Sequence, residues 1–264
     1  MKNIVLGVTA LGMREMTAHT VGITAGNMDS LQSKMILIDN ASSPAFLVKE
    51  RSQLIHNKKN LGSFYPLKQL YDKYPDADII GIMHNDCAIY EKGWDERLSK
   101  MFELDKKLGA VGLFGWQKVD KFGIDHNPIG NSFEESKPVI KYKRVTQLTP
   151  ALTLDSMCMF FRRSVIPLLD IQKDMMIRHG YDKIWPMRLR EHGYKTAVSG
   201  FSFQHKGQSM FEDPDYMKTM KKSYDARWNL DFPVESIEGM MLFEARVRFV
   251  EEFKERKNML PMSI

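Results

Sequence analysis

Short apolar runs alternate with helix-like segments through the first 116 residues, and this alternation constrains the fold more than any other feature. The runs are rich in Ile, Val, Leu and Met, and they occupy residues 3–9, 34–39, 53–57, 78–85 and 110–116. Segments long enough to form a helix lie between them, residues 94–108 among them. Near-continuous apolar strands separated by helices are typical of a mostly parallel sheet that is covered on both faces. We therefore predict an α/β domain with a Rossmann-like sheet.

The alternation ends after Trp116, and the second half of the chain is less regular. Residues 121–138 carry Gly, Pro, Asn, Asp and Ser, and this composition predicts a long loop. Further strands are expected in residues 139–148, 152–161 and 195–200, and a short helix is expected in 162–169. Residues 180–195 indicate a helix that ends at Gly193, with Pro186 in its first turn or at a kink.

The C-terminal tail predicts a separate helical extension. Residues 233–258 place Met240, Phe243, Val247 and Val250 on one stripe of an amphipathic helix. Such a stripe packs either on the domain or against a second copy of the chain. We therefore expect residues 1–210 to form the main domain and residues 211–264 a helical extension docked on it, with homo-oligomerisation through this helix as the alternative.

Composition indicates an ordinary globular protein. The chain is 43% hydrophobic and 27% charged, and no apolar run reaches the roughly 18 residues that a membrane-spanning helix requires. Its two cysteines form no CxxC pattern, which favours a reducing compartment such as the cytoplasm. The net charge of +5 favours an anionic substrate or surface without establishing nucleic-acid binding.

Polar residues follow several of the predicted strands, where parallel open sheets bind ligands. The residues at these strand ends are Thr9, Ala10, Asp39, Asn40, Asn57, Asn60, Leu61, Gly62, Asn85 and Asp86. The chain has neither a GxGxxG turn nor a GxxxxGK[ST] loop, so the phosphate groups of a ligand must be bound in another way. A divalent cation on a carboxylate would serve, because Mg²⁺ is commonly bound through one or two carboxylates and substrate phosphates. Asp86 is the candidate carboxylate, although Asp at a strand end is also a common turn residue.

Five blocks in order resemble family-two glycosyltransferases of the GT-A fold. They read ILIDNASSP, NKKNLGSF, IIGIMHNDCAIYEKGWDERL, LDSMCMFFRRSVI and GYDKIWPMRLREHGYKTAV, and the resemblance runs from about residue 3 to about residue 205. It implies a GT-A-like sheet and transfer of a hexosyl or pentosyl group from a nucleoside-diphosphate sugar. It also implies a divalent cation, Mn²⁺ or Mg²⁺, bound with the donor.

The resemblance assigns roles by position. Asp39 would contact the nucleotide base or ribose, Asn60 and Gly62 would shape the nucleotide pocket, and Asp86 would bind the metal from an Asp-x-Asp-like motif. His205, in FQHKGQS, matches the late histidine that completes the metal site. Asp182 occupies the position of the catalytic base, for which the alternative is a carboxylate that merely favours a helix N-terminus.

Three departures from the family pattern support a competing hypothesis. The first position of the Asp-x-Asp motif is His84, the Glu of the Glu-Asp pair is Tyr181, and the second Asp of the helix motif is replaced by Ile184. A catalytically silent protein that binds nucleotide sugars or acts as a scaffold would tolerate these changes.

The acceptor stays open at this stage between a soluble glycan or small molecule and a hydroxymethylated base in phage DNA. Basic residues interleaved with aromatics in residues 141–145, 160–163 and 218–227 would suit a DNA backbone, and host cytoplasm would then be the location.

Overall fold

The computed structural model describes residues 2–47, 53–119, 125–132, 142–171 and 181–206. The helices are α1 (Arg14–Gly26), α2 (Tyr65–Lys73), α3 (Trp94–Leu104), the 3₁₀ helix η2 (Arg163–Leu169) and α4 (Tyr181–Glu191). The strands of the first half are β1 (Ile4–Ala10), β2 (Lys34–Asp39), β3 (Leu54–His56), β4 (Ile79–His84), β5 (Cys87–Ile89), β6 (Leu108–Gly112) and β7 (Phe114–Val119). Those of the second half are β8 (Asp125–Gly130), β9 (Lys143–Arg144), β10 (Thr149–Pro150), β11 (Thr153–Leu154), β12 (Cys158–Arg162), β13 (Lys195–Val198) and β14 (Phe203–His205).

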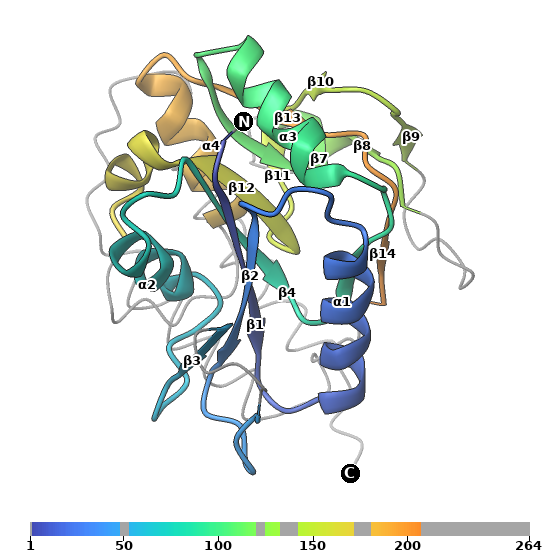
Figure 1. Cartoon of the computed structure of the whole chain (residues 1–264). Helices are drawn as coiled ribbons and strands as arrows, with labels where there is room; N and C mark the ends of the chain where they lie inside the picture. Colours follow the sequence, from blue (N-terminus) through green and yellow to red (C-terminus); the bar gives the residue numbers. More distant parts are fainter. Residues whose placement is uncertain (1, 48–52, 120–124, 133–141, 172–180, 207–264) are drawn as a thin grey trace, which may run out of the picture.

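An eight-stranded sheet in the order β10-β13-β6-β12-β4-β1-β2-β3 forms the centre of the domain (Figure 1). Strands β3, β2, β1 and β4 run parallel to one another, as do β6 and β13. Strand β12 runs antiparallel to both of its neighbours, and β10 is antiparallel to β13. A four-stranded sheet, β11-β7-β8-β9, and the β14-β5 pair adjoin it. The predicted α/β class with a mostly parallel sheet is confirmed.

Two apolar layers cover the central sheet. Ile4, Leu6 and Val8 of β1 belong to the cluster that contains the buried side chains of α3, whereas Val5 belongs to the cluster of α2 and α4. This separation follows from the strand period of two, which sends successive side chains to opposite faces. Figure 1 shows α2 and α4 on one side of the sheet and α1 on the other.

Helix α1 packs on β5 through threonines rather than through large apolar residues. Thr17, Thr20 and Thr24 are its buried residues. The Thr20 hydroxyl donates a hydrogen bond to the carbonyl of Asn85, and the Thr24 hydroxyl accepts one from the Ile89 amide. These bonds fix the short turn between β4 and β5 against the helix.

The structure corrects several sequence predictions about this half of the sheet. The apolar run 110–116 is two strands, β6 and β7, that belong to different sheets. The predicted loop 121–138 is wrong for residues 125–130, which form β8 and pair with β7. Of the strand expected in residues 139–148, the described part contains only the two-residue strand β9. Residues 121–124 and 133–138 of the predicted loop lie outside the described part of the chain.

Helix α4 confirms the predicted helix but ends at Glu191, with Gly193 at φ +77° just beyond it. Pro186 is the sixth residue of α4, not a residue of its first turn. A proline at this position cannot donate the hydrogen bond that the carbonyl of Asp182 would otherwise accept.

Among the described residues, no helix combines the length and apolar character required to cross a bilayer. The expected tail helix, residues 233–258, lies outside the described residues.

Arg162, the last residue of β12, and Arg163, the first residue of η2, each bind the C-terminal end of a different helix. The Arg162 guanidinium donates to the carbonyls of Phe102 and Asp105 at the end of α3, and to the carbonyl of Leu108 at the start of β6. The Arg163 guanidinium donates to the carbonyls of Tyr71 and Tyr74 at the end of α2. Both arginines therefore satisfy carbonyls that a helix terminus leaves without intrahelical partners.

Replacing Arg162 with alanine is expected to lower the free energy of unfolding by about 2 kcal/mol, because hydrogen bonds from a charged donor contribute about 1.5–3 kcal/mol. Urea denaturation measures the change. Arg190→Ala, at an exposed position of α4, is the matched control and should leave the transition midpoint in place. Equal midpoints for the two variants would contradict the capping role.

Candidate functional site

The turn after β4 is held rigidly at the carboxyl edge of the sheet. The His84 amide donates to the Met157 carbonyl at 2.8 Å, and the Asn85 side chain donates to the Thr17 hydroxyl of α1 at 2.9 Å. The predicted contact of Asn85 with the donor stays a prediction. In the structure its amide instead anchors the turn that carries Asp86.

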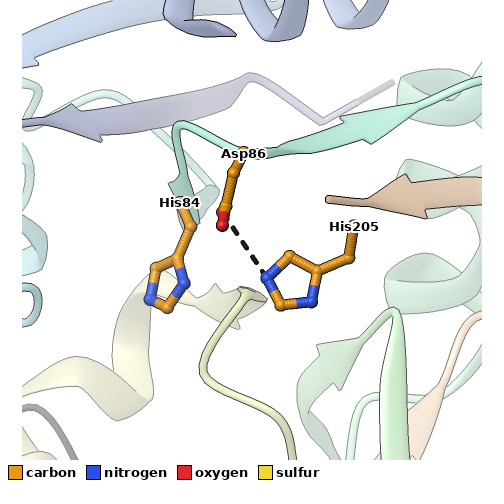
Figure 2. A group of neighbouring side chains, drawn as sticks. All are labelled: His84, Asp86 and His205. Carbon is orange, nitrogen blue, oxygen red and sulfur yellow. Dashed lines mark ion pairs between the residues drawn. The ribbon is translucent and has the colours of Figure 1, made fainter. Parts of the chain in front are cut away.

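Backbone pairing brings His205 to Asp86. Strand β14 pairs antiparallel with β5, so that His205 lies opposite Cys87, and the Lys206 amide donates to the Asp86 carbonyl at 2.9 Å. The His205 Nε2 atom lies 3.5 Å from Asp86 Oδ1 (Figure 2). The structure thus brings together the two residues that the sequence predicts as metal ligands.

His84 joins them as a third candidate ligand. One donor atom from each of His84, Asp86 and His205 lies within 4.8 Å of the others, and Figure 2 shows the Asp86 carboxylate pointing between the two rings. Metal–ligand bonds are about 2.0–2.2 Å long, so donor atoms on opposite sides of one ion lie roughly 4.2 Å apart. A small movement of side chains would bring all three onto one divalent cation.

His84 is a departure from the Asp-x-Asp pattern and was not among the predicted ligands of this metal site. The sequence signal that could have identified it is the two-residue spacing from Asp86, since histidine is itself a common metal ligand.

The Asp86 carboxylate suits a cation. Burial raises the pKa of this carboxyl, but the hydrogen bond and the charges of His205 and His84 outweigh the burial, and the pKa lies below its usual value. The Oδ1 atom is buried, and His205 Nε2, at 3.5 Å, is the partner that the described residues offer it. An ionised, buried oxygen of this kind is an appropriate ligand for a metal ion.

Thr9 and Ala10 end the neighbouring strand β1. Thr9 is in register with His84, and Ala10 is buried and in register with Asp39. The Thr9 hydroxyl oxygen is buried and makes no hydrogen bond to the described residues. A buried hydroxyl beside the cluster fits a site that is completed by a polar ligand.

A buried amide network joins the ends of β2 and β3. The Asn40 side chain donates to Asn60 Oδ1 at 2.7 Å and to the Gly62 carbonyl at 2.9 Å, and the Gly62 amide donates to Asn60 Oδ1. Asn57 donates to Asn40 Oδ1. The structure therefore brings Asn60 and Gly62 together around Asn40, another of the residues at these strand ends. Their contact with a nucleotide stays a prediction.

Asp39 is fully buried and binds its own loop. Its carboxylate accepts hydrogen bonds from the amides of Ser42 and Phe46, both at 2.9 Å, and from His56 Nδ1 at 3.0 Å. Burial raises the pKa of Asp39, but these hydrogen bonds outweigh it and the pKa lies below its usual value. Direct contact of Asp39 with a nucleotide stays a prediction.

Asp182 lies in the first turn of α4 and is half-buried. Helix α4 covers the same sheet face to which Ile80 and Ile82 of β4 point. By the strand alternation His84 points to this face as well. The assignment of Asp182 as the catalytic base stays a prediction.

Solved structures with the same architecture are glycosyltransferases. GalNAc-T7, in a crystal structure with UDP, GalNAc and Mn²⁺, aligns with a TM-score of 0.61 and 11% sequence identity over 98% of this chain. Residues 1–349 of TarS from S. aureus align over the whole chain with a TM-score of 0.58 and 11% identity, covering 76% of that fragment. The mannosyltransferase PcManGT from Pyrobaculum calidifontis, in complex with GDP-Man and Mn²⁺, aligns over the whole chain with a TM-score of 0.56 and 10% identity, covering 76% of that protein.

The chain spans 58% of the length of GalNAc-T7. No family model matches the sequence, and no curated protein matches it. The structural likeness shows the GT-A fold, which the sequence resemblance had predicted.

Proposed function

We propose that this chain transfers a sugar from a nucleoside-diphosphate sugar to a hydroxyl acceptor with the help of a divalent cation. The observation that carries the proposal is the cluster of His84, Asp86 and His205 at the carboxyl edge of a GT-A sheet. Nucleotides and Mn²⁺ are present together in the GalNAc-T7 and PcManGT crystals, which supports the same pairing here.

Each residue has a distinct task in this mechanism. Asp86, His84 and His205 would hold the cation, which supplies a Lewis acid that neutralises the charge of the diphosphate leaving group. Asp182 would accept the proton of the acceptor hydroxyl as general base. Because the carboxylate takes a proton and forms no bond to the sugar, the displacement is a single step and inverts the anomeric carbon.

The ligand set favours particular metals. Imidazole nitrogen suits first-row transition metals, whereas Mg²⁺ prefers oxygen ligands. Two imidazoles and one carboxylate therefore favour Mn²⁺ over Mg²⁺.

For the acceptor, the arrangement of basic residues favours a soluble glycan or small molecule over DNA. Arg162 and Arg163 bind helix carbonyls instead of lining a groove for phosphates. Lys143 and Arg144 are exposed on β9, but Arg144 Nε donates to Asn131 Oδ1. The third basic segment, residues 218–227, lies outside the described part of the chain. Cytoplasmic location is part of this proposal and is supported by the two free, buried cysteines.

A donor screen tests the proposed function. Uridine, guanosine and thymidine diphosphates are added with Mn²⁺ or Mg²⁺, and the melting temperature is recorded. A ligand at 100 times its Kd stabilises the native state by about 2.7 kcal/mol, which predicts a rise of about 5 °C or more. We expect at least one nucleotide to bind, and to bind more tightly with Mn²⁺ than with Mg²⁺.

The same screen, run with nucleotide sugars, separates the enzyme from its competitor. Slow release of nucleoside diphosphate without acceptor supports an enzyme, whereas binding without any release over hours supports the catalytically silent protein. No binding of any nucleotide with either metal would overturn the proposal.

A further inference from the structure

His56, at the carboxyl edge of the sheet, is partly exposed and is hydrogen-bonded to a fully buried partner, Asp39. Its side chain is 45% exposed, whereas that of its partner Asp39 is 0% exposed. Strands β2 and β3 place the two residues in register, at the ends of their strands. Sequence reasoning did not single out His56, because its role depends on this cross-strand partner.

Asp39 has little capacity left for a ligand. Its Oδ1 atom accepts from the Ser42 amide, and its Oδ2 atom accepts from both the Phe46 amide and His56 Nδ1. These three bonds hold the loop after β2 and the imidazole ring together. A nucleotide that replaced one of them would have to break a buried, charge-assisted hydrogen bond.

The same three bonds define what His56 offers. An ionised carboxylate accepts hydrogen bonds only, so His56 Nδ1 carries the proton that it donates to Asp39. With the proton on Nδ1, the other ring nitrogen, Nε2, has a free lone pair and is a hydrogen-bond acceptor. Asp39 thereby sets both the tautomer and the orientation of the exposed ring.

The surrounding rim is rigid and partly apolar. The Gly12 amide donates to the Ser42 hydroxyl at 2.8 Å, and the Arg14 guanidinium donates to the Ala45 carbonyl and lies 4.8 Å from the centre of the Phe46 ring. These contacts join the turn after β1 to the loop after β2. Leu11 and Met13, in the turn after β1, are 42% and 38% exposed.

The width of this edge suits one heterocycle and its ribose. Neighbouring strands lie about 4.8 Å apart, so the ends of β1 and β3 are roughly 10 Å from each other. Exposed apolar side chains at one end and a single acceptor at the other match a flat base, which has apolar faces and a polar edge.

We propose that His56 Nε2 accepts a hydrogen bond from the base of the donor nucleotide and that Asp39 acts only as the positioning residue of the His56 ring. This inference rests on the proposed function and specifies its donor. An acceptor at this place selects bases that carry a ring N–H, which uracil, thymine and guanine have. The corresponding ring nitrogen of adenine and cytosine is itself an acceptor and would face Nε2 without a proton between them.

The test compares nucleotide binding by the parent and by His56→Ala, in the presence of Mn²⁺, by calorimetry. Loss of one such hydrogen bond costs about 1–1.4 kcal/mol, so the Kd for the preferred nucleotide should rise about fivefold to tenfold. His192→Ala, which removes an exposed histidine at the end of α4, is the matched control and should bind as the parent does. Mn²⁺ binding without nucleotide, followed by electron paramagnetic resonance, should be the same in all three proteins.

A methylated nucleotide identifies the atom involved. Methylation of the ring N–H, as in N3-methyluridine diphosphate, should weaken binding to the parent but cause no comparable further loss in His56→Ala. Long-range ¹H–¹⁵N spectra of the parent should show His56 protonated at Nδ1, with an Nε2 signal that shifts when the nucleotide is added.

The outcomes separate the two proposals. If the parent binds a nucleotide and His56→Ala binds it equally well, the role of His56 is overturned while the proposed function stands. If Asp39→Asn abolishes binding and leaves the His56 tautomer and the fold unchanged, Asp39 contacts the base itself and the inference is wrong. If the parent binds no nucleotide at all, both proposals fail.

Discussion

Replacing Asp86 with alanine is expected to abolish Mn²⁺-dependent nucleotide binding and leave the domain folded. Asp86 is the only carboxylate in the three-residue cluster that the described residues form, and it lies between the two histidines. Its removal leaves two imidazoles with no anionic ligand, so the affinity for Mn²⁺ should fall at least 100-fold, a magnitude of about 2.8 kcal/mol. Electron paramagnetic resonance of added Mn²⁺ measures the loss directly.

The control for this variant is Asp72→Asn. Asp72 is an exposed carboxylate on α2 that pairs with Lys68 and is not a member of the cluster. It should bind Mn²⁺ and nucleotide as the parent does. If Asp86→Ala also binds both as the parent does, Asp86 is a turn residue and the proposed metal site is wrong.

The second large effect is expected for Asp182→Asn. The asparagine keeps the shape of the side chain and cannot accept the acceptor proton, so turnover should fall by roughly 10²–10⁴. Nucleotide affinity should stay unchanged, because the proposed base contacts the acceptor and not the donor. Steady-state rates of sugar transfer and calorimetry with nucleotide and Mn²⁺ provide the two measurements.

Asp170→Asn serves as the comparison for Asp182. Asp170 is an exposed carboxylate that pairs with Arg188. Arg188 belongs to α4, the helix that carries Asp182, so the loss of Asp170 tests for a general effect on that helix. Near-parental turnover in Asp182→Asn would exclude Asp182 as the base. Asp155, which follows β11, and Asp174, outside the described residues, are then the next candidates.

The strands that the sequence predicted best are those with unbroken apolar runs. Residues 34–39 form β2 with the predicted bounds, and the run predicted at 3–9 is β1, shifted by one residue. Strand β8 was missed because DHNPIG contains Asn, Pro and Gly, which are depleted in strands. Its pairing with β7 overrides these local preferences, and the Phe114 ring occupies the space that a side chain at Gly130 would need.

The part of the site that depends on local sequence was predictable, and the part that depends on pairing between strands was not. Asp86 and His205 could be proposed from short motifs, each of which stands at the end of an apolar segment. His56 could not, since its relation to Asp39 arises only when β2 and β3 pair in register. The roles of Arg162 and Arg163 could not be predicted either, because this basic pair binds carbonyls that only the folded chain brings close.

The adjacent arginines at the end of β12 have a further consequence for how this strand finds its place during folding. Arg162 is the last residue of β12 and reaches α3, whereas Arg163 begins η2 and reaches α2. Because strand residues alternate between the two faces, a slip of β12 by one residue against β4 would turn Arg162 away from α3 and leave that helix end without its donor. The pair therefore favours the correct register of β12, the central strand that runs antiparallel to both of its neighbours.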